Sequence, residues 1–242
     1  MTTARRDLGV PALVAVWVAV VLGLDTGATH LQQHGLGLVT VLLLVAVLRG
    51  EGVAVRVQVG VVVVFATAVE LVFSEWLGTY VYRLESVPLF VPPGHGLVYL
   101  AALCLGRSAW AHAHARAFLG TTLVAVGAWA VWGVTLSDRP DALGMFWFLC
   151  LLAFVRWGRS PLLYAGAVVV VTYLELVGTG LGTWTWGTED PVLGVVSMGN
   201  PPSGIAGGYA WFDAAALALT PVLLRRLGRA ASAEALAAPE RV

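Results

Sequence analysis

Residues 67–82, TAVELVFSEWLGTYVY, decide the fold, because a second stretch, TYLELVGTGLGTWTW at 172–186, repeats their pattern. With one residue deleted, both stretches carry a Thr, then Glu-Leu-Val, then a Leu-Gly-Thr turn and two alternating aromatic residues. A Pro-containing loop follows each copy, VPLFVPPGHG at 87–96 and PVLGVVSMGNPPSG at 191–204. The two copies lie about 105 residues apart. We therefore predict a tandem repeat of one structural unit.

The composition is typical of a membrane protein. The chain is 59% hydrophobic and only 12% charged, whereas soluble domains carry roughly 25% charged residues. Its formal net charge is zero, so there is no basic surface that would favour nucleic acid as a partner. We expect membrane lipid to surround most of the chain.

Eight apolar segments are long enough, with their flanks, to be membrane spans. Nearly all arginines lie before the first segment, after the eighth, or in every second loop between them, and the intervening loops carry only Arg83 and Arg139. The excess of arginine on one side places both termini in the cytoplasm of a bacterial cell. The segments are residues 9–24, 35–49, 53–77, 94–106, 117–136, 142–155, 161–180 and 204–224.

We therefore predict an all-α integral protein of the bacterial inner membrane with eight transmembrane helices. Four spans per unit is an even number, so the two units share one orientation and form parallel repeats. The first repeat covers residues 1–116, the second covers 117–229, and a disordered cytoplasmic tail covers 230–242.

Three carboxyl side chains fall inside predicted spans, Glu70, Glu175 and Asp213. An ionisable group in hydrocarbon costs roughly 2.5–3.5 kcal/mol or more and marks a functional site by default. At 1.5 Å per residue, all three lie about 10–13 Å below the outer ends of their helices. We expect them to converge in one polar pocket as candidate catalytic residues. Only Asp213 lacks an acidic counterpart in the other repeat, where Leu103 is expected.

Other polar and aromatic residues extend this candidate pocket as substrate-binding residues. Some share a helix face with an acid at a spacing of three or four, and others lie in the aromatic turns and outer loops. They are Thr67, Ser74, Tyr80, Tyr82, Arg83, His95, Thr172, Thr179, Trp184, Trp186, Asn200 and Tyr209.

Simpler interpretations stay open for several of these residues. The acids and hydroxyls could only bond neighbouring helices together, and the alternating aromatics could form an interfacial belt instead of a ligand-gripping mouth. Arg83 could pair with Glu85 or bind an anionic head group. His30, His34 and His95 could hold a metal, but their spacing is generic, so we predict neither a metal nor a cofactor.

The segment Glu175-Leu-Val-Gly-Thr-Gly-Leu-Gly-Thr-Trp-Thr-Trp resembles a signature of the membrane-bound carotenoid hydratase family. Gly78-Thr-Tyr-Val-Tyr and the following Val87-Pro88 loop are similar to the same signature, although Leu181-Gly182-Thr183 stands where the family has Pro-Phe-Gly. The whole chain also resembles uncharacterised multi-span proteins of actinobacterial type. The resemblance to hydratases implies a polytopic enzyme whose substrate is a long isoprenoid chain.

These observations lead to one functional hypothesis and two alternatives. The first is a membrane-embedded enzyme that acts on an isoprenoid or lipid, in which Glu70 or Glu175 donates a proton to a double bond and Asp213 assists. The second is a transporter of small solutes or ions with paired sites at the two glutamates. The third is a non-catalytic partner in membrane assembly.

Overall fold

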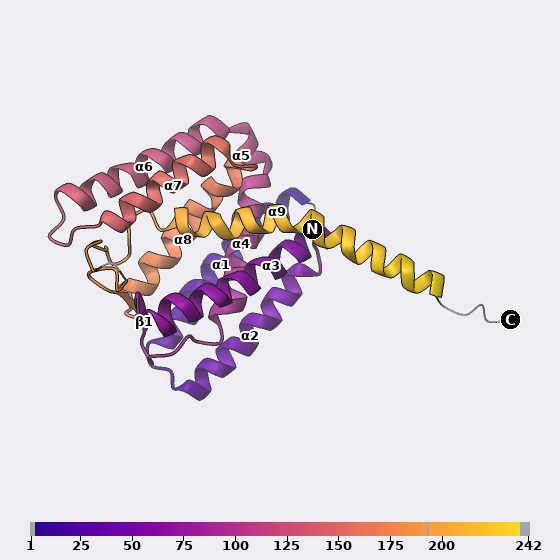
Figure 1. Ribbon diagram of the computed structural model, residues 1–242, viewed down its shortest axis with the longest axis horizontal. Coiled ribbons are helices and arrows are strands. Elements are labelled where there is room, and N and C mark those ends of the chain that lie inside the picture. The colour runs from indigo at the N-terminus through magenta and orange to yellow at the C-terminus, as the bar shows by residue number, and fades with distance from the viewer. Residues whose placement is uncertain (1–2, 193, 238–242) are drawn as a thin grey trace.

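The computed structural model describes residues 3–192 and 194–237 and is mostly helical (Figure 1). Helices α1–α5 lie in the first half of the chain, α6 crosses its midpoint and α7–α9 lie in the second half, and a short strand lies in each half. The elements are α1 Thr3–Asp25, α2 His30–Leu48, α3 Val53–Glu70, η1 Leu71–Trp76, β1 Tyr80–Tyr82, α4 Val91–Arg107, α5 Ala109–Ala113, α6 Ala115–Thr135, α7 Ala142–Trp157, α8 Pro161–Gly180, β2 Trp184–Trp186 and α9 Ala206–Ala237.

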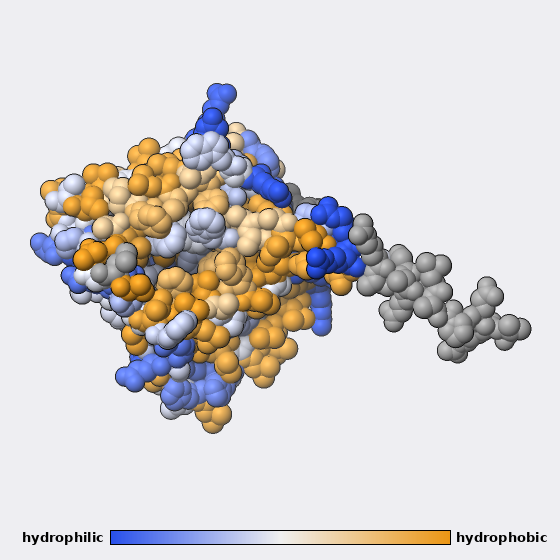
Figure 2. Space-filling view, viewed as in Figure 1, coloured by the Kyte–Doolittle hydropathy of each residue, from blue (hydrophilic) through white to orange (hydrophobic). Residues whose placement is uncertain are grey.

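Six helices in the described part of the chain are long and apolar enough to cross a membrane. They are α1, α2, α3 continued by η1, α6, α8 and α9. Figure 2 shows apolar residues over most of one face of this bundle, and large apolar side chains such as Leu31 and Trp76 are about four-fifths exposed. Such a surface suits lipid and not water, so the structure agrees with an all-α membrane protein.

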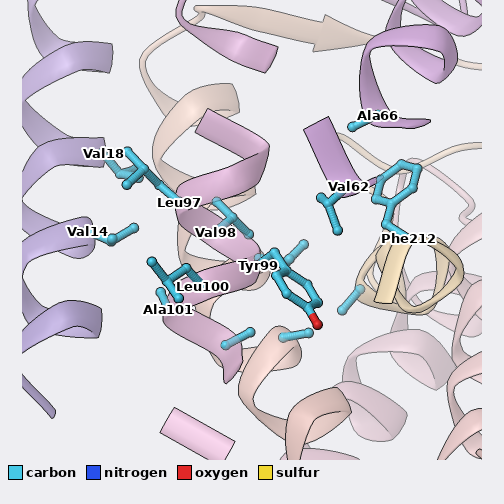
Figure 3. Packing of buried hydrophobic residues seen from close by; sticks show 14 of the residues in the cluster. Val14, Val18, Val62, Ala66, Leu97, Val98, Tyr99, Leu100, Ala101 and Phe212 are labelled. Carbon is cyan, nitrogen blue, oxygen red and sulfur yellow. The ribbon is translucent and has the colours of Figure 1, made fainter. Parts of the chain in front are cut away.

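The two remaining long segments, α4 and α7, are shorter than these six, with 17 and 16 residues. Helix α4 is nevertheless the most enclosed part of the fold, because α1, α2, α3 and α8 all pack against it. Buried side chains from α1, α3 and α9 meet those of α4 in Figure 3. The sequence predicted a span at each of the two positions, and the structure supplies a helix at each.

Close approach between helices depends on glycine at the centre of the bundle. A Cβ atom at Gly166 of α8 would lie 2.5 Å from the backbone oxygen of Ala102 in α4, closer than real Cβ contacts. Glycine there lets the α4 and α8 backbones touch. A second tight pair is α3 and α9, which join through an edge-to-face contact of Phe65 with Phe212 at 5.3 Å between ring centroids.

Most helix boundaries lie close to the predicted ones, and the starts of α1 and α2 and the end of α9 differ. Helix α1 begins at Thr3, six residues earlier than expected. Helix α2 begins at His30, five residues earlier than expected, because Thr29 and Gln32 form a reciprocal capping box. Helix α9 continues through residues 230–237, which the sequence assigned to a disordered tail; residues 238–242 of that tail lie outside the described residues.

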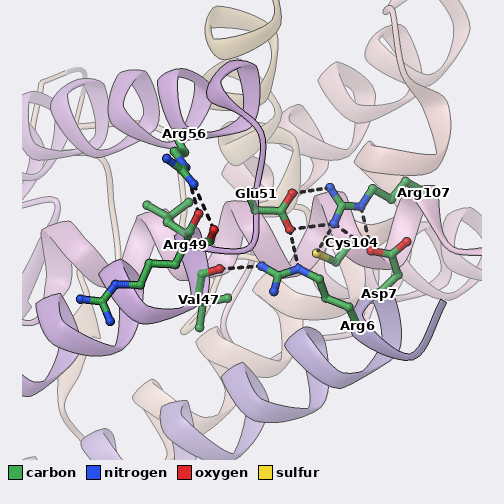
Figure 4. Close-up of polar contacts among 9 residues, drawn as sticks. Arg6, Asp7, Val47, Arg49, Glu51, Arg56, Cys104 and Arg107 are labelled. Carbon is green, nitrogen blue, oxygen red and sulfur yellow. Dashed lines mark hydrogen bonds and ion pairs between the residues drawn. The ribbon is translucent and has the colours of Figure 1, made fainter. Parts of the chain in front are cut away.

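One end of the bundle is held by a network of ion pairs (Figure 4). Arg107 at the end of α4 contacts both carboxylate oxygens of Glu51, between α2 and α3, at 2.8 Å. Arg6 of α1 contacts Glu51 at 2.9 Å, and Arg107 also contacts Asp7 at 2.8 Å. The end of α4, the start of α1 and the α2–α3 turn are therefore joined at this end.

Candidate functional site

The opposite end of the bundle carries the repeated motif, and here each glutamate-bearing helix turns into a strand. Helix α3 ends at Glu70 and continues as a π-helical turn, η1, a feature often found at functional sites. Gly78 before β1 and Gly182 before β2 both have left-handed backbone angles, φ +66° and +69°, which glycine adopts without strain. Both Leu-Gly-Thr turns thus redirect the chain back over its helix.

The two strands pair with each other as an antiparallel ribbon, with Tyr80 opposite Trp186 and Tyr82 opposite Trp184. Side chains alternate along a strand, so all four aromatics lie on the inner face and are buried, whereas Val81 is exposed. The sequence left open whether they form an interfacial belt or line a site. In the structure they contact the two buried glutamates.

Glu70 is bonded by three side chains. The hydroxyls of Tyr80 and Tyr82 donate to Oε2, each at 2.9 Å. On the other oxygen, Oε1, His95 Nε2 lies at 3.3 Å. His95 Nδ1 lies 3.1 Å from the carbonyl oxygen of Val91. A carbonyl can only accept, so Nδ1 carries a proton there.

This geometry fixes a proton between Glu70 and His95. Two arrangements fit a proton on Nδ1. In the first, the imidazole is neutral, Nε2 is an acceptor and Glu70 Oε1 carries a proton that it donates to Nε2. In the second, Nε2 is also protonated, and the imidazolium donates to the Glu70 carboxylate. In both arrangements one proton lies between the two groups, and the pair is neutral overall.

Glu175 is bonded differently. The indole N–H groups of Trp184 and Trp186 donate to Oε2 at 3.0 and 3.2 Å, and the Tyr209 hydroxyl lies 3.4 Å from Oε1. Indole is only a donor, so Oε2 accepts two bonds and holds no proton. This donor set stabilises the carboxylate. Tyr209 also stacks on His95, with ring centroids 5.5 Å apart, which brings the two glutamate clusters together.

Both clusters line one apolar cavity of about 380 Å³. Its wall comes from α1, α2, α3, α4, α7, α8 and α9 and from both strands. Phe65, Phe73 and Trp211 line the cavity and are also more than a third exposed, so the cavity reaches the apolar outer surface there. Eight of the predicted site residues line it: Glu70, Tyr80, Tyr82, His95, Glu175, Trp184, Trp186 and Tyr209.

Asp213 does not line this cavity, contrary to the expected convergence of three acids. It lies one helical turn further along α9 than Tyr209 and is buried, within electrostatic range of Tyr99 and Tyr164. Among the described residues its Oδ2 atom has no hydrogen-bond partner. The estimate of depth from span ends was too coarse to separate it from the glutamates.

Other predicted site residues have local roles outside the cavity wall. The hydroxyls of Thr67 and Thr179 donate to carbonyl oxygens one turn earlier in their own helices, at 2.6 and 2.7 Å. Asn200 accepts a bond from the backbone N–H of Trp186 at 3.1 Å and so supports the ribbon. Ser74 and Thr172 are also outside the cavity lining.

Arg83 contacts Asp25 and not Glu85. Its guanidinium lies 3.6 Å from the Asp25 carboxylate and donates to the Ala28 carbonyl oxygen at 2.6 Å. It therefore fastens the ribbon to the α1–α2 turn. Pairing with Glu85 was one of two alternatives that the sequence left open, and the fold instead brings Asp25, distant in sequence, beside Arg83.

Sequence reasoning missed two anchoring residues in the loop before α7. Arg139 donates to the carbonyl oxygens of Trp186 and Met198 at 2.8 and 2.7 Å. Asp141 accepts backbone N–H bonds from Gly199 and Ser203 at 2.8 and 2.7 Å. Both hold the long loop from β2 to α9. The only available signal was that Arg139 is one of two arginines in the loops that the sequence predicted to lie outside.

The three histidines considered for a metal do not meet. His95 is buried against Glu70, whereas His30 and His34 are exposed on α2. Within residues 3–192 and 194–237, no group of three or more His, Cys, Asp or Glu side chains is arranged to hold a metal ion.

No protein-family model, curated protein or solved structure matches this chain. The fold and the site together define a class: a helical bundle with membrane-spanning helices that encloses an apolar cavity with two glutamates in its wall. The function has to be inferred from that cavity.

Proposed function

We propose that this chain is a membrane-embedded enzyme that acts on an isoprenoid or other lipid by carboxyl acid/base chemistry. One observation carries the proposal: Glu70 Oε1 lies 3.3 Å from His95 Nε2 in the wall of an apolar cavity, an arrangement suited to hold a proton. An apolar cavity that reaches the lipid-facing surface suits a substrate with a long hydrocarbon chain. A proton held within it suits addition to a carbon–carbon double bond.

The two glutamates support opposite roles in such a reaction. The Glu70–His95 pair gives its proton to one alkene carbon, and the π electrons form the new C–H bond. The neighbouring carbon becomes positively charged and is attacked by the oxygen of a water molecule. Glu175, whose Oε2 accepts the two indole N–H bonds, takes in its ionised form the proton that this water loses. The proton then returns to Glu70–His95 along the same cavity, so the net reaction is hydration.

We also propose that the chain forms two parallel four-helix repeats with eight spans and both termini in the cytoplasm of a bacterial cell. Three features support this. The strands pair antiparallel about their middle residues, Val81 and Thr185, as a twofold axis would require. That axis would also exchange the α4–α8 contact with the α3–α9 contact. The N-terminus and the far part of α9 lie at one end, away from β1 (Figure 1).

The test is expression in a bacterial host that accumulates acyclic isoprenoids, followed by mass analysis of the extracted lipids. Wild-type protein should produce species heavier by one water. Glu70→Gln and Glu175→Gln should each lower product by at least a hundredfold, in line with the loss of a general acid or base. Asp138→Asn, an exposed acid at the same end of the bundle, is the matched control and should be fully active. An unchanged lipid profile with well-expressed wild-type protein would refute the enzymatic proposal.

A transporter is the second candidate, and one observation favours it. Polar side chains continue deeper than the cavity, where Tyr99 of α4 donates to Gln58 of α3 at 3.1 Å and Asp213 lies nearby. Against it, the ion pairs of Arg107 with Glu51 and Asp7 tie together the end of the bundle opposite the ribbon. A transporter would leave the lipid profile unchanged and move a solute across vesicles that contain the purified protein.

A further inference from the structure

The charge of the cavity lining does not balance. Its ionisable side chains include Glu70, Glu175, Asp190 and His95, and no arginine is among its lining residues. Because Glu70 and His95 share one proton, they contribute no net charge. Glu175, when ionised, places a negative charge in this wall, and Asp190 is a further acid in the lining. A buried carboxylate is costly unless hydrogen bonds or a positive charge compensate it.

The cationic side chains at this end of the bundle are engaged elsewhere. Arg83 lies against Asp25 and the Ala28 carbonyl, and Arg139 donates to carbonyl oxygens of the β2–α9 loop. Neither lines the cavity. A positive charge beside an ionised Glu175 would therefore come from a ligand and not from either arginine.

Aromatic rings surround the same carboxylate. Trp184 and Trp186 bond it directly, Tyr209 contacts its other oxygen, and Tyr80 lies 4.6 Å from Trp186 between ring centroids. Tryptophan and tyrosine rings attract organic cations. Glu175 and these four rings line one wall of the cavity, and together they form a site for a diffuse positive charge.

Most of the remaining wall is apolar. Valines and a tryptophan of α1, such as Val14, Trp17 and Val18, line it, as do Leu143 and Trp147 of α7. This surface would bury a hydrocarbon chain.

We propose that the cavity binds an organic cation in which one positively charged nitrogen or carbon is attached to a long apolar chain. The charge lies beside Glu175, and the chain extends along the apolar wall. A permanent alkylammonium is the stable member of this ligand class. A carbocation formed by protonating an alkene, as in the proposed hydration, is the transient member. Binding of the stable member does not require the proposed function to be correct.

The experiment uses full-length protein purified in an uncharged maltoside detergent. Saturable binding of labelled dodecyltrimethylammonium is measured by equilibrium dialysis and competed with 2,2-dimethyltetradecane, which has the same shape without the charge. The neutral compound should compete at least tenfold more weakly. Equal competition would overturn the proposal, because shape and hydrophobicity would then explain binding.

Variants test the charge count directly. Glu175→Gln should weaken ammonium binding at least tenfold. Glu70→Gln should weaken it much less, because the Glu70–His95 pair is already neutral. Asp138→Asn should bind as wild type does. Equal losses in Glu175→Gln and Glu70→Gln, or no loss in Glu175→Gln, would contradict the assignment. If Glu175→Gln fails to fold, the comparison of the two ligands on wild-type protein still decides.

The outcome is separable from that of the lipid-profile experiment. If binding depends on the charge but the lipid profile is unchanged, the cavity binds a permanent ammonium compound, and only the proposed hydration is refuted. Hydration without charge-selective binding would refute only the cation site.

Discussion

Three buried carboxyl groups of this chain differ in how their oxygens are bonded. Glu70 and Glu175 each have three side-chain partners. Asp213 has an oxygen with no hydrogen-bond partner among the described residues, although the residue is only 3% exposed. An unsatisfied buried polar group costs about 1–3 kcal/mol. The hydrogen-bond partners of the two glutamates offset the cost of burying them. The burial of Asp213 is not offset in this way and lowers the stability of the protein.

Replacing Asp213 with leucine should therefore stabilise the protein. Leucine removes the unsatisfied oxygen and keeps the same branched arrangement of side-chain heavy atoms, so we expect a gain of about 1–3 kcal/mol in the free energy of unfolding. Thermal unfolding in detergent measures it, with Asp213→Asn as the control that keeps the polarity. A loss of stability in Asp213→Leu would show that the carboxyl has a stabilising partner.

Among the elements, the ribbon is what turns two sequence motifs into one site. Alternation of Tyr80 with Tyr82 and of Trp184 with Trp186 was visible in the sequence, and so was the glycine turn before each pair. Their burial was not, because it depends on β1 pairing with β2 across about 100 residues. The depth estimated from the sequence also placed Asp213 level with the two glutamates. The packing of α9, which the sequence does not reveal, keeps Asp213 out of the cavity wall.

The contact between α8 and the ribbon predicts opposite effects at two glycines of one helix. A Cβ atom at Gly178 would overlap the Trp184 ring, whereas at Gly180 nothing lies within 4 Å. Gly178→Ala should displace the indole that bonds Glu175 and cost about 1–3 kcal/mol of stability. Gly180→Ala should be neutral or stabilise by about 0.4–1 kcal/mol, because alanine restricts the unfolded chain.

Thermal unfolding and the near-ultraviolet circular dichroism of tryptophan distinguish the two variants. Gly178→Ala should alter the tryptophan signal, and Gly180→Ala should leave it as in wild type. Similar behaviour of both would mean that Trp184 is not packed against α8 as the structure has it.

For the whole molecule, the sequence supplied the membrane character and the positions of the long helices, since both follow from local apolar composition. It could not supply which helices meet at the centre. The enclosure of α4 by four other helices depends on small residues that allow close approach, and composition alone does not locate their partners. The ion-pair network at the end opposite the ribbon was also invisible, because Arg107 and Asp7 are 100 residues apart.

This network makes a prediction for global stability. Arg107→Gln leaves buried Glu51 with one cationic partner and Asp7 with none. We expect a loss of about 3 kcal/mol, the lower end of the range for removing one partner of a buried pair, because Arg107 is partly exposed. Arg116→Gln is the control, since Arg116 is exposed nearby in the sequence and should change stability by less than about 0.5 kcal/mol.

Acid should weaken the same network. Burial raises the pKa of Glu51, but hydrogen bonds and charges from Arg107 and Arg6 outweigh it, so the pKa lies below its ordinary value of 4.5. A lowered pKa in the folded state means that the stabilisation is complete above pH 4.5 and is lost as the pH falls through the folded pKa. Wild-type thermal stability should therefore decline in acid, and Arg107→Gln, which has already lost most of this coupling, should decline less. Parallel declines of the two proteins would place the acid-sensitive groups outside the network.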